Sequence, residues 1–259
     1  MAAESLFSQV FSIKKPVIAM LHIFDDDIQA QIDQALEDLE CLQLFVEGVI
    51  VENYGFGYSN LNPNLAVGGI VETLIRIIDA VIRESTIPVG LNILPNDYEK
   101  ALRVASITGA EFIQLDHVTG RFLRCYPVDP HELTIARNKY PEVALLGGIH
   151  PKYYTLTDST TSISESANEA KLLADAVVVT GNRTGGQADL DDIKSAKDAI
   201  GSHPLIIGSG VDPDNVCEQL SIADGAIVGT AFKREGVNFG NPIDVSLVEI
   251  FMNEVKRSR

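Results

Sequence analysis

The sequence contains no tryptophan, and only three methionines and three cysteines occur among its 259 residues. The cysteines, Cys41, Cys125 and Cys217, lie far apart and form no Cys-x-x-Cys pair, which argues against a disulfide framework and against a zinc site. Thiols in a reducing compartment are therefore expected. Basic residues are also scarce, because 20 Lys and Arg stand against 36 Asp and Glu, for a formal net charge of −16. Since nucleic-acid backbones are bound chiefly by Lys and Arg, this balance argues against a nucleic-acid partner.

Long hydrophobic runs are absent as well. No apolar segment approaches the roughly 18 residues that a membrane-spanning helix needs. Residues 1–15 carry an early acidic residue, a short apolar patch and no clear cleavage site, so a signal peptide is not expected. We expect a cytoplasmic protein without direct membrane insertion. No linker rich in Pro, Gly or Ser divides the chain, so residues 1–259 are expected to form a single domain, with a polar loop within residues 155–170.

What is present is an alternation of short apolar, β-branched segments with helical patterns. Most of these segments are continuously apolar, which is typical of parallel strands covered by helices. The expected strands are residues 17–23, 48–53, 88–94, 112–118, 143–149, 176–181, 204–210 and 225–231. The expected helices are residues 26–44, 65–84, 98–108, 130–139, 164–173, 189–200, 213–221 and 243–256. Eight strand-then-helix units predict a single (β/α)8 TIM barrel, with an open, doubly wound sheet as the alternative.

Three of the expected helices carry a start signal in the sequence. Proline is favoured at the first position of a helix, directly behind a capping residue. Such pairs are Asp129 with Pro130, Asp212 with Pro213, and Asn241 with Pro242.

Two glycine-containing loops follow the last two expected strands. They read GSGVDPDN from residue 208 and GTAFKREG from residue 229. In TIM barrels the loops after strands seven and eight frequently form a phosphate site, because glycine lets main-chain N–H groups approach an anion closely. The predicted phosphate-binding residues are Gly208, Ser209, Gly210, Gly229, Thr230 and Lys233. Ordinary tight turns that close the barrel are the alternative interpretation.

Polar residues gather at the ends of the other expected strands. A polar side chain in an apolar strand is costly unless it is satisfied, so this concentration is typical of a catalytic rim. The predicted catalytic residues are His22, Glu52, Asp116, His117, His150 and Lys152, and the other predicted ligand-binding residues are Asn53, Asn92, Thr180 and Gly181. Because neighbouring residues of a strand point to opposite faces, only one of Asp116 and His117 is expected to face the barrel interior. His22 as a core histidine, and Lys152 and Lys233 as solvated lysines, are the alternatives.

Several named chemistries lack their sequence motif. No His-x-His ends the first strand, and no GxSxG, HExxH or GxxxxGK[ST] motif occurs. The sixth strand reads AVVVT and contains no lysine for Schiff-base chemistry. The histidines and carboxylates offer only loose material for a metal site, so no metal is assigned, and the cofactor is unknown. Flavin mononucleotide in the phosphate site is the weakest alternative considered.

Six segments together resemble the BtpA family, a group of barrel proteins named for a role in photosystem I biogenesis. The segments are VIAMLHI, GVIVENYG, PVGLNIL, DAVVVTGNRTG, PLIIGSGVDPDNV and GAIVGTAFKREG, and the resemblance runs from about Pro16 to Met252. It implies a fold similar to the phosphate-binding barrels. It also implies an enzyme-like barrel, with the family's name pointing to the accumulation of a membrane complex.

The chain departs from the family pattern at three strand ends. The family tends to have Pro-Leu-Pro-Gly after strand one, where this chain reads FDDD from Phe24. After strand five it tends to have Asp, His, Lys and a second His, where this chain keeps His150 and Lys152 but has Gly148 and Tyr153. The end of strand four tends to carry Asn where this chain has Asp116. The resemblance is therefore closer at the phosphate loops than at the reactive end.

Two classes of function follow. In the first, the protein is an enzyme acting on a small phosphorylated metabolite by isomerase- or lyase-type chemistry, with Glu52 or Asp116 as general base and His22, His117 or His150 as the acid. In the second, it is a non-catalytic assembly or regulatory factor that retains a ligand-binding barrel. The acidic surface is compatible with a homo-oligomer, although no residue pattern specifies an interface.

Overall fold

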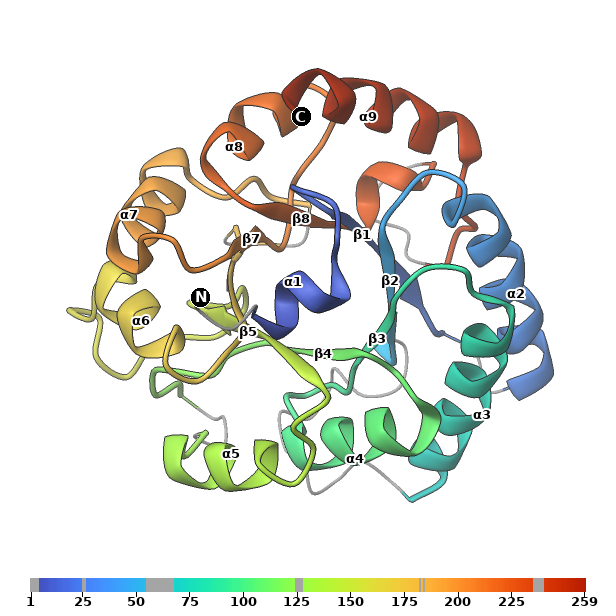
Figure 1. The fold of residues 1–259 in the computed structure, drawn as a ribbon, viewed down its shortest axis with the longest axis horizontal. Coiled ribbons are helices and arrows are strands. Elements are labelled where there is room, and N and C mark those ends of the chain that lie inside the picture. The colour runs from blue at the N-terminus through green and yellow to red at the C-terminus, as the bar shows by residue number, and fades with distance from the viewer. Residues whose placement is uncertain are drawn as a thin grey trace.

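The chain folds into a closed barrel of eight parallel strands, each paired with its sequence neighbours and the last paired with the first (Figure 1). The computed structural model describes residues 5–24, 27–54, 68–123, 128–181, 183, 185–234 and 240–259. The strands are β1 Val17–His22, β2 Gly48–Glu52, β3 Val89–Asn92, β4 Phe112–Leu115, β5 Ala144–Ile149, β6 Ala176–Val179, β7 Leu205–Ile207 and β8 Gly225–Val228. The predicted (β/α)8 barrel is confirmed, and the open sheet is excluded by the pairing of β8 with β1.

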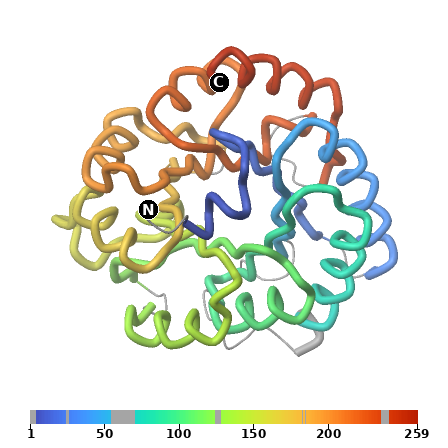
Figure 2. Tube along the Cα trace, viewed as in Figure 1, coloured from blue at the N-terminus to red at the C-terminus, as the bar shows by residue number. Residues whose placement is uncertain are grey.

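Helices form a ring around the barrel, as the ribbon and the tube both show (Figures 1 and 2). They are α2 Ile28–Leu42, α3 Gly68–Glu84, α4 Tyr98–Thr108, α5 Pro130–Arg137, α6 Ile163–Ala170, α7 Leu190–Ile200, α8 Val216–Ile222 and α9 Val245–Ser258. The predicted start at Pro130 is confirmed, because the Asp129 side chain accepts from two N–H groups of the first turn of α5. The predictions at Pro213 and Pro242 are wrong. The Asp212 side chain instead closes a turn before α8, and Asp244 caps α9.

A short helix that the sequence analysis missed, α1 Leu6–Val10, lies across the amino-terminal end of the barrel (Figure 1). The ring of Phe7 contacts that of Phe11 at a centroid distance of 5.1 Å, and Phe11 contacts Phe112 inside the barrel at 5.3 Å. Gly90 leaves the room that the Phe112 ring occupies, because a Cβ at Gly90 would lie 2.4 Å from it. Aromatic side chains therefore fill this end, and the carboxyl end is left for a site.

Successive residues of each strand alternate between the barrel interior and the surrounding helices. The interior cluster contains Ile18, Met20, Ile50, Phe112, Ala144, Leu146, Ala176, Val178, Ile206 and Ile227, which lie two residues apart wherever a strand contributes two. The residues of opposite parity on the same strands, such as Leu21, Val51 and Leu115, belong to the outer cluster with the helices. Continuing this alternation past each strand decides which polar residues at the carboxyl ends face the interior.

An acidic residue before every second strand joins that strand to its predecessor at the amino-terminal end. These residues are Glu47, Glu111, Asp175 and Asp224. The N–H of each donates to a carbonyl at the start of the preceding strand, and its carboxylate accepts the N–H of the same residue. That residue is the first of the strand in three cases and the second, Leu145, in the case of Asp175. Basic side chains pair with three of the four, namely Arg259 with Glu47, Arg137 with Asp175, and Lys197 with Asp224.

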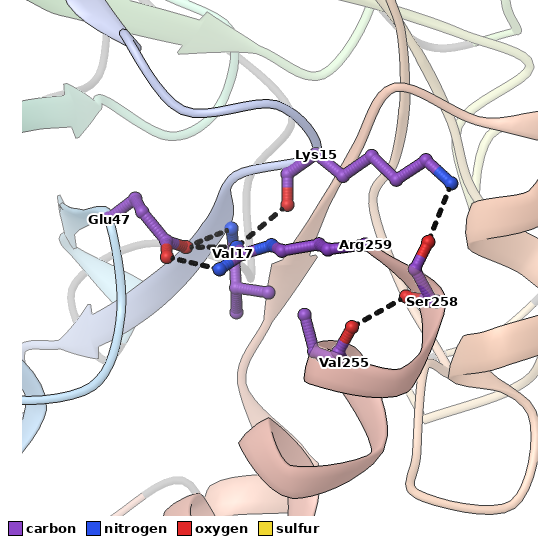
Figure 3. A network of polar contacts seen from close by, with 6 residues as sticks. All are labelled: Lys15, Val17, Glu47, Val255, Ser258 and Arg259. Carbon is purple, nitrogen blue, oxygen red and sulfur yellow. Dashed lines mark hydrogen bonds and ion pairs between the residues drawn. The ribbon is translucent and has the colours of Figure 1, made fainter.

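The hydrogen-bonded contact at Glu47 also fixes the carboxyl end of α9 (Figure 3). The Arg259 guanidinium donates to both Glu47 carboxylate oxygens at 2.7 Å and to the Lys15 carbonyl at 2.9 Å. Lys15 in turn donates from Nζ to the Ser258 carbonyl at 3.0 Å. Bidentate Arg–carboxylate pairs are among the stronger polar contacts. They hold residues 258 and 259 against Lys15, which precedes β1, and Glu47, which precedes β2.

None of the helices in the described ranges combines the length and the apolar character needed to cross a membrane.

Candidate functional site

A pocket opens at the carboxyl end of the barrel, on the side opposite α1. Its walls come from the ends of β1, β2, β4, β5, β6, β7 and β8 and from the loops that follow them. Of the residues predicted from the sequence, the pocket is lined by His22, Glu52, Asp116, Lys152, Thr180, Gly208, Ser209, Gly210, Gly229 and Thr230. Carboxylates and a lysine therefore share one cavity with the two glycine loops.

A buried amide connects the two carboxylates. Asn92, at the end of β3, donates from Nδ2 to Glu52 Oε2 at 2.7 Å and makes a longer contact of 3.5 Å to Asp116 Oδ1. The hydroxyl of Tyr154 donates to the other Asp116 oxygen at 2.9 Å. These hydrogen bonds fix both carboxylates on one wall of the pocket, although Asn92 is not itself a lining residue.

The two carboxylates are held where ionisation is costly. Burial raises the pKa of Glu52 to about 7, with the negative charge of Asp116 as the second cause. The Lys152 ammonium and the Asn92 hydrogen bond act in the opposite direction. Burial also raises the pKa of Asp116, against the hydrogen bonds from Tyr154 and Asn92. A carboxyl group that titrates near neutral pH suits general acid–base chemistry, because it both accepts and releases protons there.

His22 lies beside Glu52, with its Nε2 atom 3.8 Å from Glu52 Oε1. Burial lowers the pKa of His22 well below its ordinary value, and the positive charges of Lys233 and Lys152 lower it further. The imidazole is therefore neutral at physiological pH. A neutral imidazole offers a hydrogen bond without a full charge.

Removing the ammonium of Lys152 is expected to raise the pKa of Glu52. The Lys152→Met variant keeps a long side chain but loses the charge that favours the ionised carboxylate, so we expect an upward shift of about one pH unit. The titration is measured by NMR of carboxyl-13C-labelled glutamate. The matched control is Lys194→Met on the exposed face of α7, which should leave the midpoint unchanged. An unchanged midpoint in Lys152→Met would contradict the role given to Lys152.

The opposite wall consists of main chain after β6, β7 and β8. The Ser209 side chain accepts the Gly181 N–H at 2.8 Å and contacts the Gly186 carbonyl at 3.4 Å. Gly210 has a φ of +67°, and a Cβ there would lie 2.1 Å from the Gly186 carbonyl oxygen. The loops after β6 and β7 are thus packed together, and only glycine fits at their contact.

This packing leaves main-chain donors at the pocket. Among the hydrogen bonds between described residues, none uses the N–H groups of Ser209, Gly210, Gly229 or Thr230. All four residues line the pocket. Unpaired N–H groups around a concave surface are suited to an anion, because each can donate to one of its oxygens.

Other predicted site residues lie away from this pocket. Asn53 faces outward, where its side chain accepts the Leu94 N–H at 2.7 Å and donates to the Leu94 carbonyl. His117 is fully buried on the outer side of Asp116, as the strand alternation predicts, and burial lowers its pKa to about 4. Its ring packs against Phe122 at a centroid distance of 4.7 Å.

His150 and Gly181 border a neighbouring cleft, which shares Lys152 and Thr180 with the pocket. The His150 Nε2 atom lies 2.9 Å from the Ser166 hydroxyl. Lys233 is 3% exposed and is not among the described lining residues of the pocket. Its ammonium lies 6.0 Å from the centre of the Phe24 ring, and burial lowers its pKa against the effect of Asp38.

Three lining residues with a polar group on the side chain were not predicted, namely Tyr54, Gln114 and Tyr154. Gln114 had a signal in the sequence, because it is the polar residue inside the apolar strand FIQL. The two tyrosines are supplied by loops, whose path no periodic pattern indicates. Across the described ranges, no group of three or more His, Cys, Asp or Glu residues is arranged to hold a metal ion.

The chain resembles known proteins along most of its length. A family model described as "BtpA family" matches residues 13–257. The chain is 30% identical to "Photosystem I biogenesis protein BtpA" of Synechocystis sp., over 94% of this chain and 89% of that protein. It is 32% identical to an uncharacterized protein of Thermococcus kodakarensis, over 86% of this chain and 88% of that protein. The solved structure of N-(5'-phosphoribosyl)anthranilate isomerase from Pyrococcus furiosus matches with a TM-score of 0.60 at 18% identity, covering 94% of this chain and 99% of that one.

Proposed function

The chain belongs to the BtpA family, and we propose that it is an enzyme that transfers protons on a small phosphorylated metabolite, by isomerase- or lyase-type chemistry. The observation that carries the proposal is a single pocket with two different walls. One wall holds Glu52, Asp116 and Lys152, and the other presents main-chain N–H groups that no described residue pairs. A substrate with a phosphate at one end and a reactive carbon at the other matches both walls.

The phosphate is placed against the loops after β7 and β8. The N–H groups of Ser209, Gly210, Gly229 and Thr230 supply donors without adding side-chain bulk. Binding energy from a remote phosphate positions the reactive part of a substrate against catalytic groups. The structural neighbour from Pyrococcus furiosus acts on a phosphoribosyl compound, as its name states, which agrees with a phosphate ligand for this barrel.

The proton is transferred by Glu52. With a pKa of about 7, ionised Glu52 removes a proton from a carbon next to a carbonyl group, and Lys152 stabilises the negative charge that develops on the carbonyl oxygen. Where that carbon bears a hydroxyl group, the hydroxyl proton passes to the former carbonyl oxygen, and return of the first proton to the former carbonyl carbon completes an isomerisation. Where the next carbon bears a leaving group, its departure with the electron pair completes a lyase reaction. Neutral His22 donates a hydrogen bond, and Asp116 is oriented by Tyr154 and Asn92.

A carboxylate introduced among the main-chain donors should weaken binding of phosphorylated compounds. We expect Thr230→Glu to lower their affinity at least about tenfold, because like charges close together in a poorly solvated pocket repel. The measurement is a thermal-shift series against inorganic phosphate, sugar phosphates and nucleotides. A ligand at 100 times its dissociation constant should stabilise the parent by about 2.7 kcal/mol.

The control for that variant is Ser202→Glu, which adds the same charge at an exposed position at the other end of the barrel, between α7 and β7. Ser202→Glu should retain the ligand response of the parent. If Thr230→Glu also retains it, the phosphate does not bind at these loops. If no phosphorylated compound shifts the melting curve of the parent, the proposed substrate class is wrong.

A second candidate function is a non-catalytic assembly factor that uses the same pocket as a ligand sensor. The name of the Synechocystis relative favours it, since that protein is described by a role in photosystem biogenesis. This candidate predicts saturable binding of a phosphorylated compound that is recovered unchanged after long incubation. Detection of a product by NMR or mass spectrometry would exclude it.

A further inference from the structure

Three polar side chains inside the barrel carry a buried atom that has no hydrogen-bond partner in the described part of the chain. These atoms are Asn92 Oδ1, Gln114 Oε1 and Thr180 Oγ1. Each residue follows the interior alternation, because Gln114 is two residues after Phe112 and Thr180 is two residues after Val178. Gln114 and Thr180 line the pocket, and Asn92 supports its two carboxylates.

Gln114 is the most informative of the three. It lies one interior position deeper than Asp116, and Met20, Val178 and Ile227 line the pocket around it with apolar side chains. Only 9% of the residue is exposed. Burying an amide with an unpaired oxygen costs free energy, which a leucine or methionine at this position would avoid. Because Gln114 lines the pocket, a ligand bound there can supply the missing partner.

The chemistry of these groups restricts the ligand. A neutral amide and a hydroxyl donate to and accept from hydroxyl groups, whereas an alkyl chain would leave them unpaired. A carboxylate at this depth would be repelled by Glu52 and Asp116, which already repel each other's charge.

We propose that Gln114 is a substrate-recognition residue which, with Thr180, binds hydroxyl groups of a polyhydroxylated phosphate ester of the sugar phosphate class. This proposal rests on the proposed function, because it describes the end of the substrate that lies away from the phosphate. It adds that the site selects for hydroxyl groups and not for the phosphate alone.

The test compares the parent with Gln114→Met, which keeps the length of the side chain and removes the amide. The probes are inorganic phosphate, aldose and ketose phosphates of three to six carbons, and pentyl phosphate, whose chain carries no hydroxyl group. Affinities are measured by isothermal titration calorimetry, and melting temperatures are recorded without ligand. Gln219→Met is the matched control. Gln219 in α8 is fully buried, and its amide is likewise unpaired among the described residues, but it is not a lining residue of the pocket.

We expect the parent to bind at least one sugar phosphate ten times or more tightly than pentyl phosphate. Gln114→Met should lose most of that preference, bind inorganic phosphate as the parent does, and melt at or above the temperature of the parent. Gln219→Met should keep the preference. This set of results would show that the Gln114 amide serves the ligand and not the fold.

Two outcomes would overturn the inference while leaving the proposed function intact. One is equal binding of sugar phosphates and pentyl phosphate by the parent. The other is a Gln114→Met variant that melts well below the parent or retains the full preference. If neither inorganic phosphate nor any phosphate ester binds the parent, the proposed function fails and the inference fails with it.

Discussion

Replacing Glu52 with glutamine is expected to lower turnover by at least about 100-fold, because the variant has no carboxylate to accept a proton. The same change should stabilise the folded chain at neutral pH. Burial raises the pKa of Glu52 from 4.5 to about 7, so ionisation of this side chain costs the native state free energy that the unfolded chain does not lose. A difference of this size corresponds to about 3 kcal/mol.

The stability gained by Glu52→Gln should depend on pH, because the pKa of Glu52 is higher in the native state than in the unfolded state. Because the native state holds the Glu52 proton more tightly than the unfolded state, the parent loses stability as the pH rises from about 4.5 to about 7. The glutamine side chain of the variant does not titrate, so this particular loss is absent from the variant. The gain from Glu52→Gln should therefore be close to zero at pH 4.5 and reach its full value above pH 7.

Urea unfolding of both proteins at several pH values measures this difference without knowledge of the substrate. Glu249→Gln, on the exposed side of α9, is the control and should show no pH-dependent gain. A gain that is absent at pH 8 would mean that Glu52 ionises without cost in the fold. A turnover rate unchanged by Glu52→Gln would remove this residue from the catalytic role.

The barrel itself could be predicted because each strand repeats one simple pattern. Parallel strands covered by helices are continuously apolar, and segments such as AVVV and GAIV show that pattern without interruption. The short helix α1 was missed, because five residues carry too little periodicity to separate a helix from a loop. The Asp212–Pro213 and Asn241–Pro242 pairs gave wrong helix starts, because a proline that follows Asp or Asn is also common at the beginning of a turn.

The candidate site could be predicted in part, as particular residues show. The rule that barrel sites lie at carboxyl ends of strands located Glu52, Asp116 and Lys152 in one pocket. The same rule includes Asn53, whose side chain faces outward, because the strand end alone does not say which face a residue takes. Lys233 lies within the glycine-containing loop after β8, yet its ammonium lies over the Phe24 ring and not among the described lining residues of the pocket. Such turns depend on contacts between distant segments, which no local pattern contains.

A second large effect is expected from adding one methyl group at Gly148, inside the end of β5. A Cβ there would lie 2.0 Å from the Asp116 carbonyl oxygen and 2.9 Å from that of Leu115. The neighbouring strand must therefore move. The Val118 N–H, which donates to the Gly148 carbonyl at 3.0 Å, would be displaced with it. We expect Gly148→Ala to destabilise the fold by about 3 kcal/mol or more, as overpacking against rigid backbone does.

The effect on the site separates this prediction from a general loss of stability. Displacing the end of β4 moves Asp116 away from Asn92 and Tyr154, so the variant should bind phosphorylated ligands weakly even below its melting temperature. The control is Gly109→Ala, where φ is +85° but a Cβ would contact nothing, and the cost should be about 1 kcal/mol. The resemblance to the family leads one to expect an aspartate at position 148. If Gly148→Ala is as stable as the parent and binds ligands as tightly, the backbone of β5 can shift enough to accept a side chain at this position without disturbing the pocket.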